Sequence, residues 1–281
     1  MQDVHAQLEA AGLIVDGNLE IARLVRCKTD SDTHAKKSGW YVLHEFRLRN
    51  GATVMTGRYG NWKKYGDESF KIEFELPPLS DEERAEFAQR QADQRDQAEQ
   101  EKNQRADDAA TRANKIFSKL PDSGASDYLK RKKVRAFGLR FSRGSIVVPV
   151  QTIDGNLIGL QFIAADGSKK FLTGTAKRGA FHLIGDIQAA APLAIAEGYA
   201  TAASIHMAAG WPVVVAFDAG NLMPVAQALR AKYPDQLMVV CADDDSQTVG
   251  NPGVTKATEV ARVIEAKLWV PVFSIDQQAA A

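Results

Sequence analysis

The feature that most limits the possible folds is the alternation of short apolar runs with helix-like segments over residues 191–281. The runs lie within PLAIAEG, WPVVVAFDAGNL, QLMVVCADDD and WVPVF, and segments of helical character separate them. Strands that alternate with helices in this way pair in parallel, and the helices cover both faces of the sheet. The sequence therefore predicts a parallel α/β domain in this part of the chain.

Acidic residues directly follow three of these runs. Glu197 comes after LAIA, Asp218 comes after VVVAF, and Asp243 and Asp245 come after LMVVCA. Because functional groups in such sheets lie outside the carboxyl ends of the strands, we expect these side chains at one edge of the sheet. Side chains alternate along an extended backbone, so Asp243 and Asp245 would share a side and Asp244 would face away.

The expected pocket has the chemistry of a divalent metal site. Carboxylate oxygens completed by water are the ligands of Mg²⁺ or Mn²⁺, and a bound cation relieves the repulsion among Glu197, Asp243 and Asp245. Asp218 is a candidate for an additional ligand. The alternative for each residue taken alone is an ordinary turn or helix cap, since acidic residues commonly end strands.

The tract from 79 to 120 contains no glycine or proline and is rich in Ala, Gln, Glu and Arg. These residues favour a helix, and Ser80 with Glu83 forms the pattern of a capping box at its start. Because no heptad stripe of apolar residues is sustained, a long solvated connector is favoured over a coiled coil. An apolar face returns at Ile116 and Phe117, where we expect the helix to dock on the next domain.

Two other regions have mainly strand character. Residues 1–78 mix short β-like runs with turn residues and predict a small α+β module. Residues 121–190 contain SIVVPVQTIDGNLIGLQFI, a hairpin pattern that turns at Asp154-Gly155-Asn156, and a second turn follows at Asp166-Gly167. The predicted order is thus an N-terminal module (1–78), a connector helix (79–120), a second α+β subdomain (121–190) and the parallel α/β domain (191–281).

Composition excludes several classes of protein. The chain has 281 residues, with 35 basic and 35 acidic side chains, so it lacks the net positive charge of a protein that coats nucleic acid. No apolar run has the length of a membrane span, and the start of the sequence lacks the pattern of a signal peptide. Its two cysteines indicate a reducing cytoplasm and exclude a cysteine zinc ribbon, so we expect no zinc.

The combination of AIAEGYATAAS, VVVAFDAGNL and VVCADDDSQTVGNPGVTKA resembles a TOPRIM domain. This is the metal-binding fold of DnaG-type primases, type IA and II topoisomerases and several nucleases. Glu197-Gly198 and Asp243-x-Asp245 match its acidic motifs. Upstream, DYLKRKKVRAFGLRF, SIVVPVQTIDGNLIGLQFI and KKFLTGTAKRGAFHLIG follow the order of the subdomain that precedes TOPRIM in primase cores. The DAGNL and TVGNPG variants resemble primases of phages and conjugative plasmids.

The resemblance implies a primase that makes short primers on single-stranded DNA from nucleoside triphosphates in DNA replication. Glu197, Asp243 and Asp245 would be the catalytic residues and would hold Mg²⁺ or Mn²⁺ for nucleotidyl transfer. Basic residues of the upstream subdomain would face template and nucleotide. Lys170 and Lys177 match those places, and Lys169 and Arg178 are neighbours of uncertain register.

The first 78 residues could take the place of the zinc ribbon with which such primases begin. Cations are interleaved there with aromatic residues, a combination that suits single-stranded nucleic acid. We expect Trp40, Trp62, Lys63 and Lys64 to contact the template. The alternative for the two tryptophans is packing in the core of a small domain.

Three other functions remain open at this stage. A TOPRIM nuclease would use the same carboxylates to activate water. A non-catalytic nucleic-acid-binding protein, or a regulatory protein of a mobile element, could retain the fold for another purpose. A replicative helicase is a possible partner of the primase, and no membrane association is expected.

Overall fold

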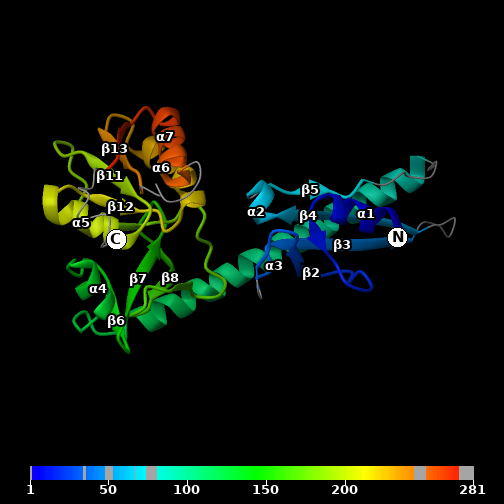
Figure 1. Ribbon diagram of the computed structural model, residues 1–281, viewed down its shortest axis with the longest axis horizontal. Helices are drawn as coiled ribbons and strands as arrows, with labels where there is room; N and C mark the ends of the chain where they lie inside the picture. The colour runs from blue at the N-terminus through cyan, green and yellow to red at the C-terminus, as the bar shows by residue number, and fades with distance from the viewer. Residues whose placement is uncertain are drawn as a thin grey trace. The chain divides into compact units, whose positions relative to one another are not determined.

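The computed structural model describes residues 2–33, 36–47, 53–66, 68–73, 81–243 and 251–271. It divides into two compact units, Met1–Gln97 and Ala98–Ala281, which we call the N-terminal and the C-terminal unit (Figure 1). No helix in the described part of the chain is long and apolar enough to cross a membrane.

The N-terminal unit is an antiparallel sheet with two short helices. Its strands pair in chain order, as a meander, and the first helix precedes them. The elements are α1 (Gln2–Ala10), β1 (Leu13–Ile14), β2 (Leu24–Thr29), β3 (Gly39–Arg47), β4 (Thr53–Asn61), α2 (Trp62–Tyr65) and β5 (Phe70–Lys71). These elements combine helices and strands, and the limit of this module at residue 78 stays a prediction.

One face of this sheet forms the core of the N-terminal unit. Side chains alternate along β3, so Tyr41 and Leu43 are buried beneath Leu8 of α1. The intervening residues of β3, such as Trp40, therefore lie on the opposite face.

The long helix α3 runs from Asp81 to Phe117, within the predicted limits. Its predicted cap, Ser80, and the side chain of Glu83 lie outside the described residues. The docking predicted near its end is confirmed, because Ile116 and Phe117 pack against a cluster that contains the fully buried Ala113. The role of the helix as a connector stays a prediction.

Two polar contacts and one glycine fix this docking. Arg112 donates to the Thr173 carbonyl at 2.6 Å, and Asn114 donates to the Leu157 carbonyl at 3.0 Å. A Cβ atom on Gly174 would lie only 2.7 Å from the Arg105 carbonyl oxygen, so a glycine is needed where the helix approaches this loop.

The C-terminal unit includes the second part of α3, which is followed along the chain by an antiparallel sheet. Its elements are α4 (Asp127–Lys132), β6 (Arg140–Ser142), β7 (Ser145–Gln151), β8 (Leu157–Ile163) and β9 (Lys169–Phe171). The strands pair in chain order. The predicted hairpin is confirmed: β7 pairs with β8 around Gly155, whose φ of 85° suits a tight turn, and Gly167 at φ 91° lies between β8 and β9.

The second sheet of the C-terminal unit is the predicted α/β domain. Its strands are β10 (His182–Ile184), β11 (Leu193–Ala196), β12 (Val213–Val215), β13 (Met238–Cys241) and β14 (Lys267–Trp269). Their order is β10-β12-β11-β13-β14, in which β11 to β14 are parallel and β10 is an antiparallel edge strand. The helices are α5 (Tyr199–Ala209), α6 (Ala219–Lys232) and α7 (Pro252–Val263).

Two details differ from the sequence-based expectation. The last strand was expected within residues 269–273, but β14 ends at Trp269, because Pro271 has no N–H with which to continue a ladder. In addition, β10 precedes residue 191 and nevertheless pairs with β12 of the parallel sheet.

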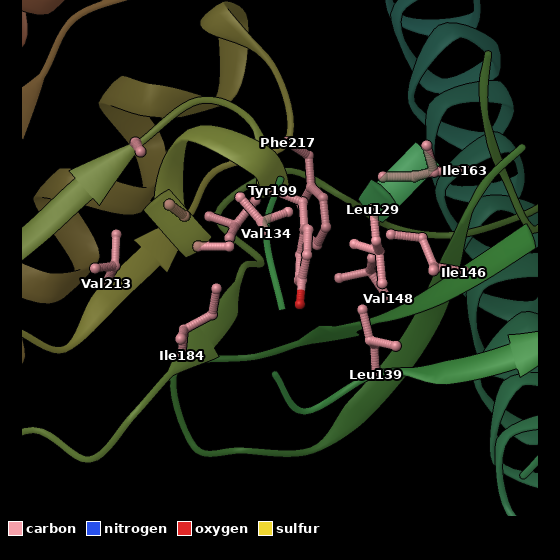
Figure 2. Packing of buried hydrophobic residues seen from close by; sticks show 14 of the residues in the cluster. Leu129, Val134, Leu139, Ile146, Val148, Ile163, Ile184, Tyr199, Val213 and Phe217 are labelled. Atoms are coloured by element: carbon pink, nitrogen blue, oxygen red, sulfur yellow. The ribbon is translucent and has the colours of Figure 1, made fainter. Parts of the chain in front are cut away.

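One apolar cluster joins the two sheets of the C-terminal unit. It combines Ile146, Val148 and Ile163 from the first sheet with Val213 and Tyr199 from the second sheet and α5 (Figure 2). A second cluster, on the other face of the parallel sheet, packs the sheet against α6 and α7. Helices thus cover both faces, as predicted.

A buried polar group lies in the first cluster. The Tyr199 hydroxyl accepts from the Phe137 amide at 2.7 Å, and His182 Nε2 lies 3.0 Å from the Phe137 carbonyl oxygen. The carbonyl can only accept, so Nε2 carries the proton. Within the described residues His182 Nδ1 has no hydrogen-bond partner. Burial lowers the pKa of His182 to about 4, against the opposing effect of the hydrogen bond to Phe137, so the imidazole is neutral at pH 7.

Candidate active site at the carboxyl edge of the parallel sheet

Two of the three described acidic candidates, Glu197 and Asp243, leave neighbouring strands at the same edge. Strands β11 and β13 are adjacent, with Ala196 opposite Cys241. Glu197 follows β11 directly, and Asp243 lies two residues beyond the end of β13. Both side chains are half-buried. Asp245 and Asp244 lie outside the described residues, so the expected pairing of Asp243 with Asp245 stays a prediction.

The first turn of α5 connects these two acidic positions. Thr201, four residues after Glu197, donates its hydroxyl to Asp243 Oδ1 at 3.2 Å. The amino end of a helix carries partial positive charge, which stabilises carboxylates placed beside it. This hydrogen bond thus holds Asp243 next to the start of the helix that Glu197 precedes.

A lysine reaches the same place from the first sheet. A Cβ atom on Gly198 would lie 3.7 Å from Lys169 Nζ and 3.9 Å from Thr201 Oγ1. Gly198 has extended backbone dihedrals, and a Cβ atom there would make only ordinary van der Waals contacts, so the distances serve here to place the Lys169 ammonium group beside the start of α5. An ammonium group, a hydroxyl and two carboxyl groups therefore gather around the start of α5.

The strand register distinguishes Lys169 from Lys170. Lys169 is paired with Ile163, which belongs to the cluster between the two sheets. Lys170 is paired with Phe162, which packs against the cluster formed with α3. Paired residues share a face of the sheet, so only Lys169 of the two lies on the face toward the acidic site.

Lys177 lies at a neighbouring part of the rim. Its ammonium group pairs with Asp218 Oδ2 at 2.5 Å, while Asp218 Oδ1 caps α6 by accepting from the Asn221 amide at 3.1 Å. Both oxygens of Asp218 are therefore engaged by the protein. Its role as a metal ligand stays a prediction. Arg178, the next residue, is exposed.

Asn221 is a residue that the sequence analysis missed. Its side chain, 3% exposed, accepts from the Gly179 amide at 2.7 Å and donates to the Ala180 and Ala216 carbonyls, each at 2.9 Å. These bonds tie the loop that carries Lys177 to the end of β12. The available signal was the spacing Asp218-x-x-Asn, in which the second side chain is placed in the first helical turn.

An aromatic pair links the two lysine positions. Phe171, on the same side of β9 as Lys169, meets Phe217 edge-on at 5.6 Å. Lys177 Nζ lies 5.8 Å from the centre of the Phe171 ring. Phe217 has a φ of 74°, a strained conformation for a residue with a side chain, and such strain concentrates at functional sites.

Tyr128 of α4 also borders this region, and it too was missed. Burial raises the pKa of its hydroxyl, the hydrogen bond from the Ala200 amide opposes this, and the charge of Asp243 adds to the increase. The phenol therefore stays protonated next to a carboxylate. Cys241 has its pKa raised to about 12 by burial and by Asp243, so it is not a thiolate nucleophile.

The comparison with known proteins agrees with this geometry. Residues 192–273, which contain both acidic positions, match the Toprim domain. This chain carries a Toprim domain. The sequence-based recognition of that fold is confirmed.

The resemblance to primases is confirmed by curated relatives. A DNA primase TraC of Escherichia coli is 36% identical over 265 residues, which cover 90% of this chain and 24% of that protein. A second DNA primase TraC of the same species is 36% identical over 249 residues, covering 84% of this chain and 16% of that protein. The chain thus spans less than a quarter of the length of these relatives.

Solved structures of primases are more distantly similar. The DnaG primase catalytic domain bound to single-stranded DNA is 13% identical with a TM-score of 0.41, covering 62% of this chain and 74% of that one. The primase fragment of the bacteriophage T7 primase-helicase protein is 14% identical with a TM-score of 0.39, covering 56% and 68%. These scores are too low to support conclusions about the site.

The donor atoms of the Toprim edge fit a divalent metal ion of the magnesium type. Glu197, Asp243 and Thr201 offer oxygen atoms, the ligands that Mg²⁺ and Mn²⁺ prefer. In the described part of the chain no three His, Cys, Asp or Glu side chains are grouped as a complete metal site. Toprim domains in general bind divalent metal, and the choice between Mg²⁺ and Mn²⁺ in this chain is a proposal.

The candidates in the N-terminal unit form a separate group. Trp40 and Trp62 are not members of the buried core of that unit, and their ring centroids are 6.0 Å apart. Lys63 forms an ion pair with Asp32 at 3.2 Å, and Lys64 Nζ lies 5.1 Å from the centre of the Tyr65 ring. The structure thus brings the two tryptophans together on one surface and pairs both lysines with neighbours in the same unit.

Proposed function

We propose that this chain is a DNA primase that joins nucleotides into short primers on a single-stranded DNA template. The observation that carries the proposal is the convergence of Glu197, Asp243 and Lys169 at the first turn of α5 in a Toprim domain. The identity to DNA primase TraC over most of the chain supports the same activity.

The proposed reaction uses this arrangement of opposite charges. The 3′-oxygen of the growing primer forms a bond to the α-phosphorus of the incoming nucleotide, the bond to pyrophosphate breaks, and the 3′-hydroxyl proton passes to water. Glu197, Asp243 and Asp245 would hold Mg²⁺ or Mn²⁺. When bound, this ion would stabilise the negative charge on the attacking 3′-oxygen and on the leaving pyrophosphate.

The lysines would act on the phosphates of the nucleotide. Lys169 is near the carboxylates, so its ammonium group would contact the triphosphate and orient it toward the attacking oxygen. Lys177 would contact the same triphosphate with a smaller net gain in binding free energy, because its ion pair with Asp218 has to break first. Arg178 is exposed beside Lys177 and would contact template or nucleotide phosphates. Lys170, on the other face of β9, would have a smaller role.

A nuclease would use the same carboxylates to direct water at a phosphodiester. Lys169 and Lys177 would bind the triphosphate of an incoming nucleotide, and this favours nucleotide addition over hydrolysis. An assay with end-labelled single-stranded DNA, the four NTPs or dNTPs, and Mg²⁺ or Mn²⁺ separates the two functions. Template-dependent products longer than one nucleotide support the primase, and shortened template without such products contradicts it.

The partners of this primase are also proposals. The expected substrates are single-stranded DNA and nucleoside triphosphates, and a replicative helicase is the proposed macromolecular partner. Stimulation of primer synthesis by a purified host helicase would support that partnership. A cytoplasmic location is proposed from the two cysteines, both of which are buried, unpaired thiols.

A further inference from the structure

The N-terminal sheet has a second face that bears cations and aromatic rings. The register places Arg26, Trp40 and Gly60 side by side in one row across β2, β3 and β4. The next row consists of Leu24, Val42, Arg58 and Lys71. We call these two rows, together with Trp62 directly after β4, the outer face.

Side chains of the outer face are exposed to solvent, whereas those of the opposite face are buried in the core. Leu24 is 58% exposed and Trp62 is 37% exposed, whereas Tyr41 and Leu43 on the core side of β3 are at most 1% exposed. Arg26 is also exposed. Large apolar and aromatic side chains at such exposure, bordered by cations, are typical of a binding surface.

The rings form a small platform. A Cβ atom on Gly60 would lie 2.6 Å from Trp40 Nε1, so the glycine lets the indole lie against β4. The Trp40 and Trp62 rings are inclined by 37°, and the Arg26 guanidinium carbon lies 4.2 Å from the centre of the Trp62 ring. A planar cation and two indoles thus offer adjacent flat surfaces.

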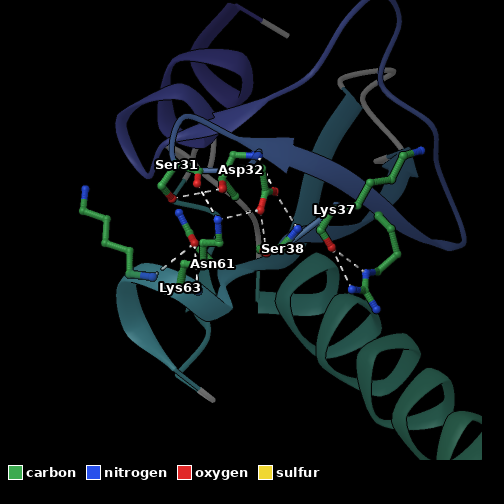
Figure 3. Close-up of polar contacts among 9 residues, drawn as sticks. Ser31, Asp32, Lys37, Ser38, Asn61 and Lys63 are labelled. Carbon is green, nitrogen blue, oxygen red and sulfur yellow. Dashed lines mark hydrogen bonds and ion pairs between the residues drawn. The ribbon is translucent and has the colours of Figure 1, made fainter. Parts of the chain in front are cut away.

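Hydrogen bonds to the backbone hold this platform in place (Figure 3). Asn61 accepts from the Lys63 and Lys64 amides at 3.2 Å and donates to the Ala11 carbonyl at 3.1 Å, which fixes the turn that carries Trp62. The Arg26 guanidinium donates to the Lys37 carbonyl at 2.7 Å. The platform therefore loses little conformational entropy when a ligand binds.

The cations of the N-terminal unit differ in whether an acidic residue offsets their charge. Lys63 pairs with Asp32, whose carboxylate is fully buried. Burial acts to raise the pKa of Asp32, but hydrogen bonds from Ser38 and Thr29 and the contact with Lys63 outweigh it and lower that pKa. Asp32 is thus charged and offsets the charge of Lys63.

The two arginines of the outer face keep their charge available. Arg26 donates to a carbonyl, and Arg58 donates to the hydroxyl and carbonyl of Ser69. These partners are neutral, and no ion pair of either arginine is found within the described residues. The surface therefore combines positive charge with exposed aromatic rings.

We infer that the outer face binds single-stranded DNA. Two successive bases stack on Trp62 and Trp40, and the phosphates beside them contact Arg26 and Arg58. Unpaired bases expose the π-faces that this surface needs, whereas duplex DNA keeps them stacked within the helix. The inference rests on the proposed function only in naming this strand as the template of the primase.

The test is the affinity of the whole chain for a fluorescent oligothymidine, measured by anisotropy over a series of salt concentrations. Trp62→Ala should weaken binding about tenfold, because it removes one of the aromatic rings on which a base stacks. Trp62→Phe should recover much of that loss. Arg26→Ala should lower the slope of log K against log salt by about 0.7, the value for one phosphate contact on a single strand.

A matched control is available in the C-terminal unit. Trp269 is 46% exposed, comparable to Trp62, and Trp269→Ala should leave the affinity unchanged. Circular dichroism of each variant verifies that it is folded. Duplex DNA of the same sequence should bind more weakly than the single strand, and its binding should not depend on Trp62.

The outcomes separate this inference from the proposed primase. If folded Trp62→Ala binds the single strand as tightly as the unchanged chain does, or if duplex binds equally well through Trp62, the inference is wrong whatever the enzymatic result. If Trp62→Ala loses binding but the unchanged chain makes no primers, the inference stands and the primase proposal fails. Glu197→Gln should lose synthesis and keep binding.

Discussion

The outer face of the N-terminal sheet and the Toprim edge use the same kinds of side chain for different tasks. Both place cations beside aromatic rings: Arg26 beside Trp62 in one, Lys177 beside Phe171 in the other. At the Toprim edge the cations stand near the half-buried acidic residues that follow the strands. On the outer face neither row contains an acidic residue. Asp32 of the same unit is buried and paired with Lys63.

That difference shows that the position of the acidic groups decides what a group of cations can do. Carboxylates at a strand end can hold a metal ion and share a triphosphate with lysines, which permits chemistry. Arginines stacked on indoles without such carboxylates can only bind. Changes to the two regions should therefore affect synthesis and affinity separately.

The largest effect is expected from the carboxylates. Asp243→Asn, like Glu197→Gln, should lower primer synthesis by at least about a hundredfold, because each removes a charged oxygen ligand. Affinity for single-stranded DNA should change less than about twofold. Asp235→Asn, at an exposed position before the start of β13 and therefore at the opposite end of that strand from Asp243, is the matched control and should keep full synthesis. Synthesis that survives both site variants would remove these residues from the reaction.

The two units should also differ in their response to acid. The pKa of His182 is about 4 in the folded protein and about 6.5 in an unfolded chain, so between these values the unfolded state binds more protons. The free energy of unfolding of the C-terminal unit should therefore fall by up to about 3 kcal/mol as the pH drops through this window.

In the N-terminal unit, Asp32 should cause no loss of stability in this pH window. Its lowered pKa means that its contribution is present above the ordinary carboxyl value of 3.8 and disappears only as the pH falls further. Hydrogen exchange of each unit at pH 7 and pH 5 measures the difference. His182→Gln should reduce the acid sensitivity of the C-terminal unit, and an equal sensitivity in that variant would contradict this explanation.

The register of β9 gives a smaller and more selective effect. Lys169→Ala should raise the KM for the nucleoside triphosphate about tenfold, because a hydrogen bond to a charged group contributes roughly 1.5–3 kcal/mol. Lys170→Ala, next to it on the opposite face, is its matched control and should raise KM less than about twofold. The reverse order would show that Lys170 is the lysine that serves the nucleotide.

The smallest effect is expected at a lysine of the N-terminal unit. Lys63→Ala should weaken binding of single-stranded DNA less than about twofold, because Asp32 already offsets its charge. Arg26→Ala at the same salt concentration should weaken it more. Equal losses in the anisotropy titration would place both cations on the DNA.

The fold was predicted from the sequence wherever the pattern was local. The order of strands and helices after residue 191, the turn at Gly155 and the helix over 81–117 all follow from periodicity and turn chemistry. The end of β14 was misplaced because the apolar pattern outweighed Pro271. The membership of β10 could not be foreseen, since its antiparallel pairing with β12 joins segments that are distant in the sequence.

The candidate site was predictable only in part for the same reason. Glu197 and Asp243 were found because they follow strands directly. Lys169 could not be separated from Lys170 without the pairing to β8, which decides the face of each. Thr201, Asn221 and Tyr128 act through contacts with residues 42, 41 and 115 positions away in the sequence, and only Asn221 had a local signal, its spacing from Asp218.

The apolar cluster shared by the two sheets of the C-terminal unit restricts how the chain can be divided. A fragment that starts at residue 191 would leave β12 without its neighbour β10 and would strip Ile146, Val148 and Ile163 from one side of Tyr199. The bare sheet edge and the apolar surface would drive such a piece into aggregates. Any minimal version of the Toprim part must therefore be cut well upstream, before the antiparallel sheet begins.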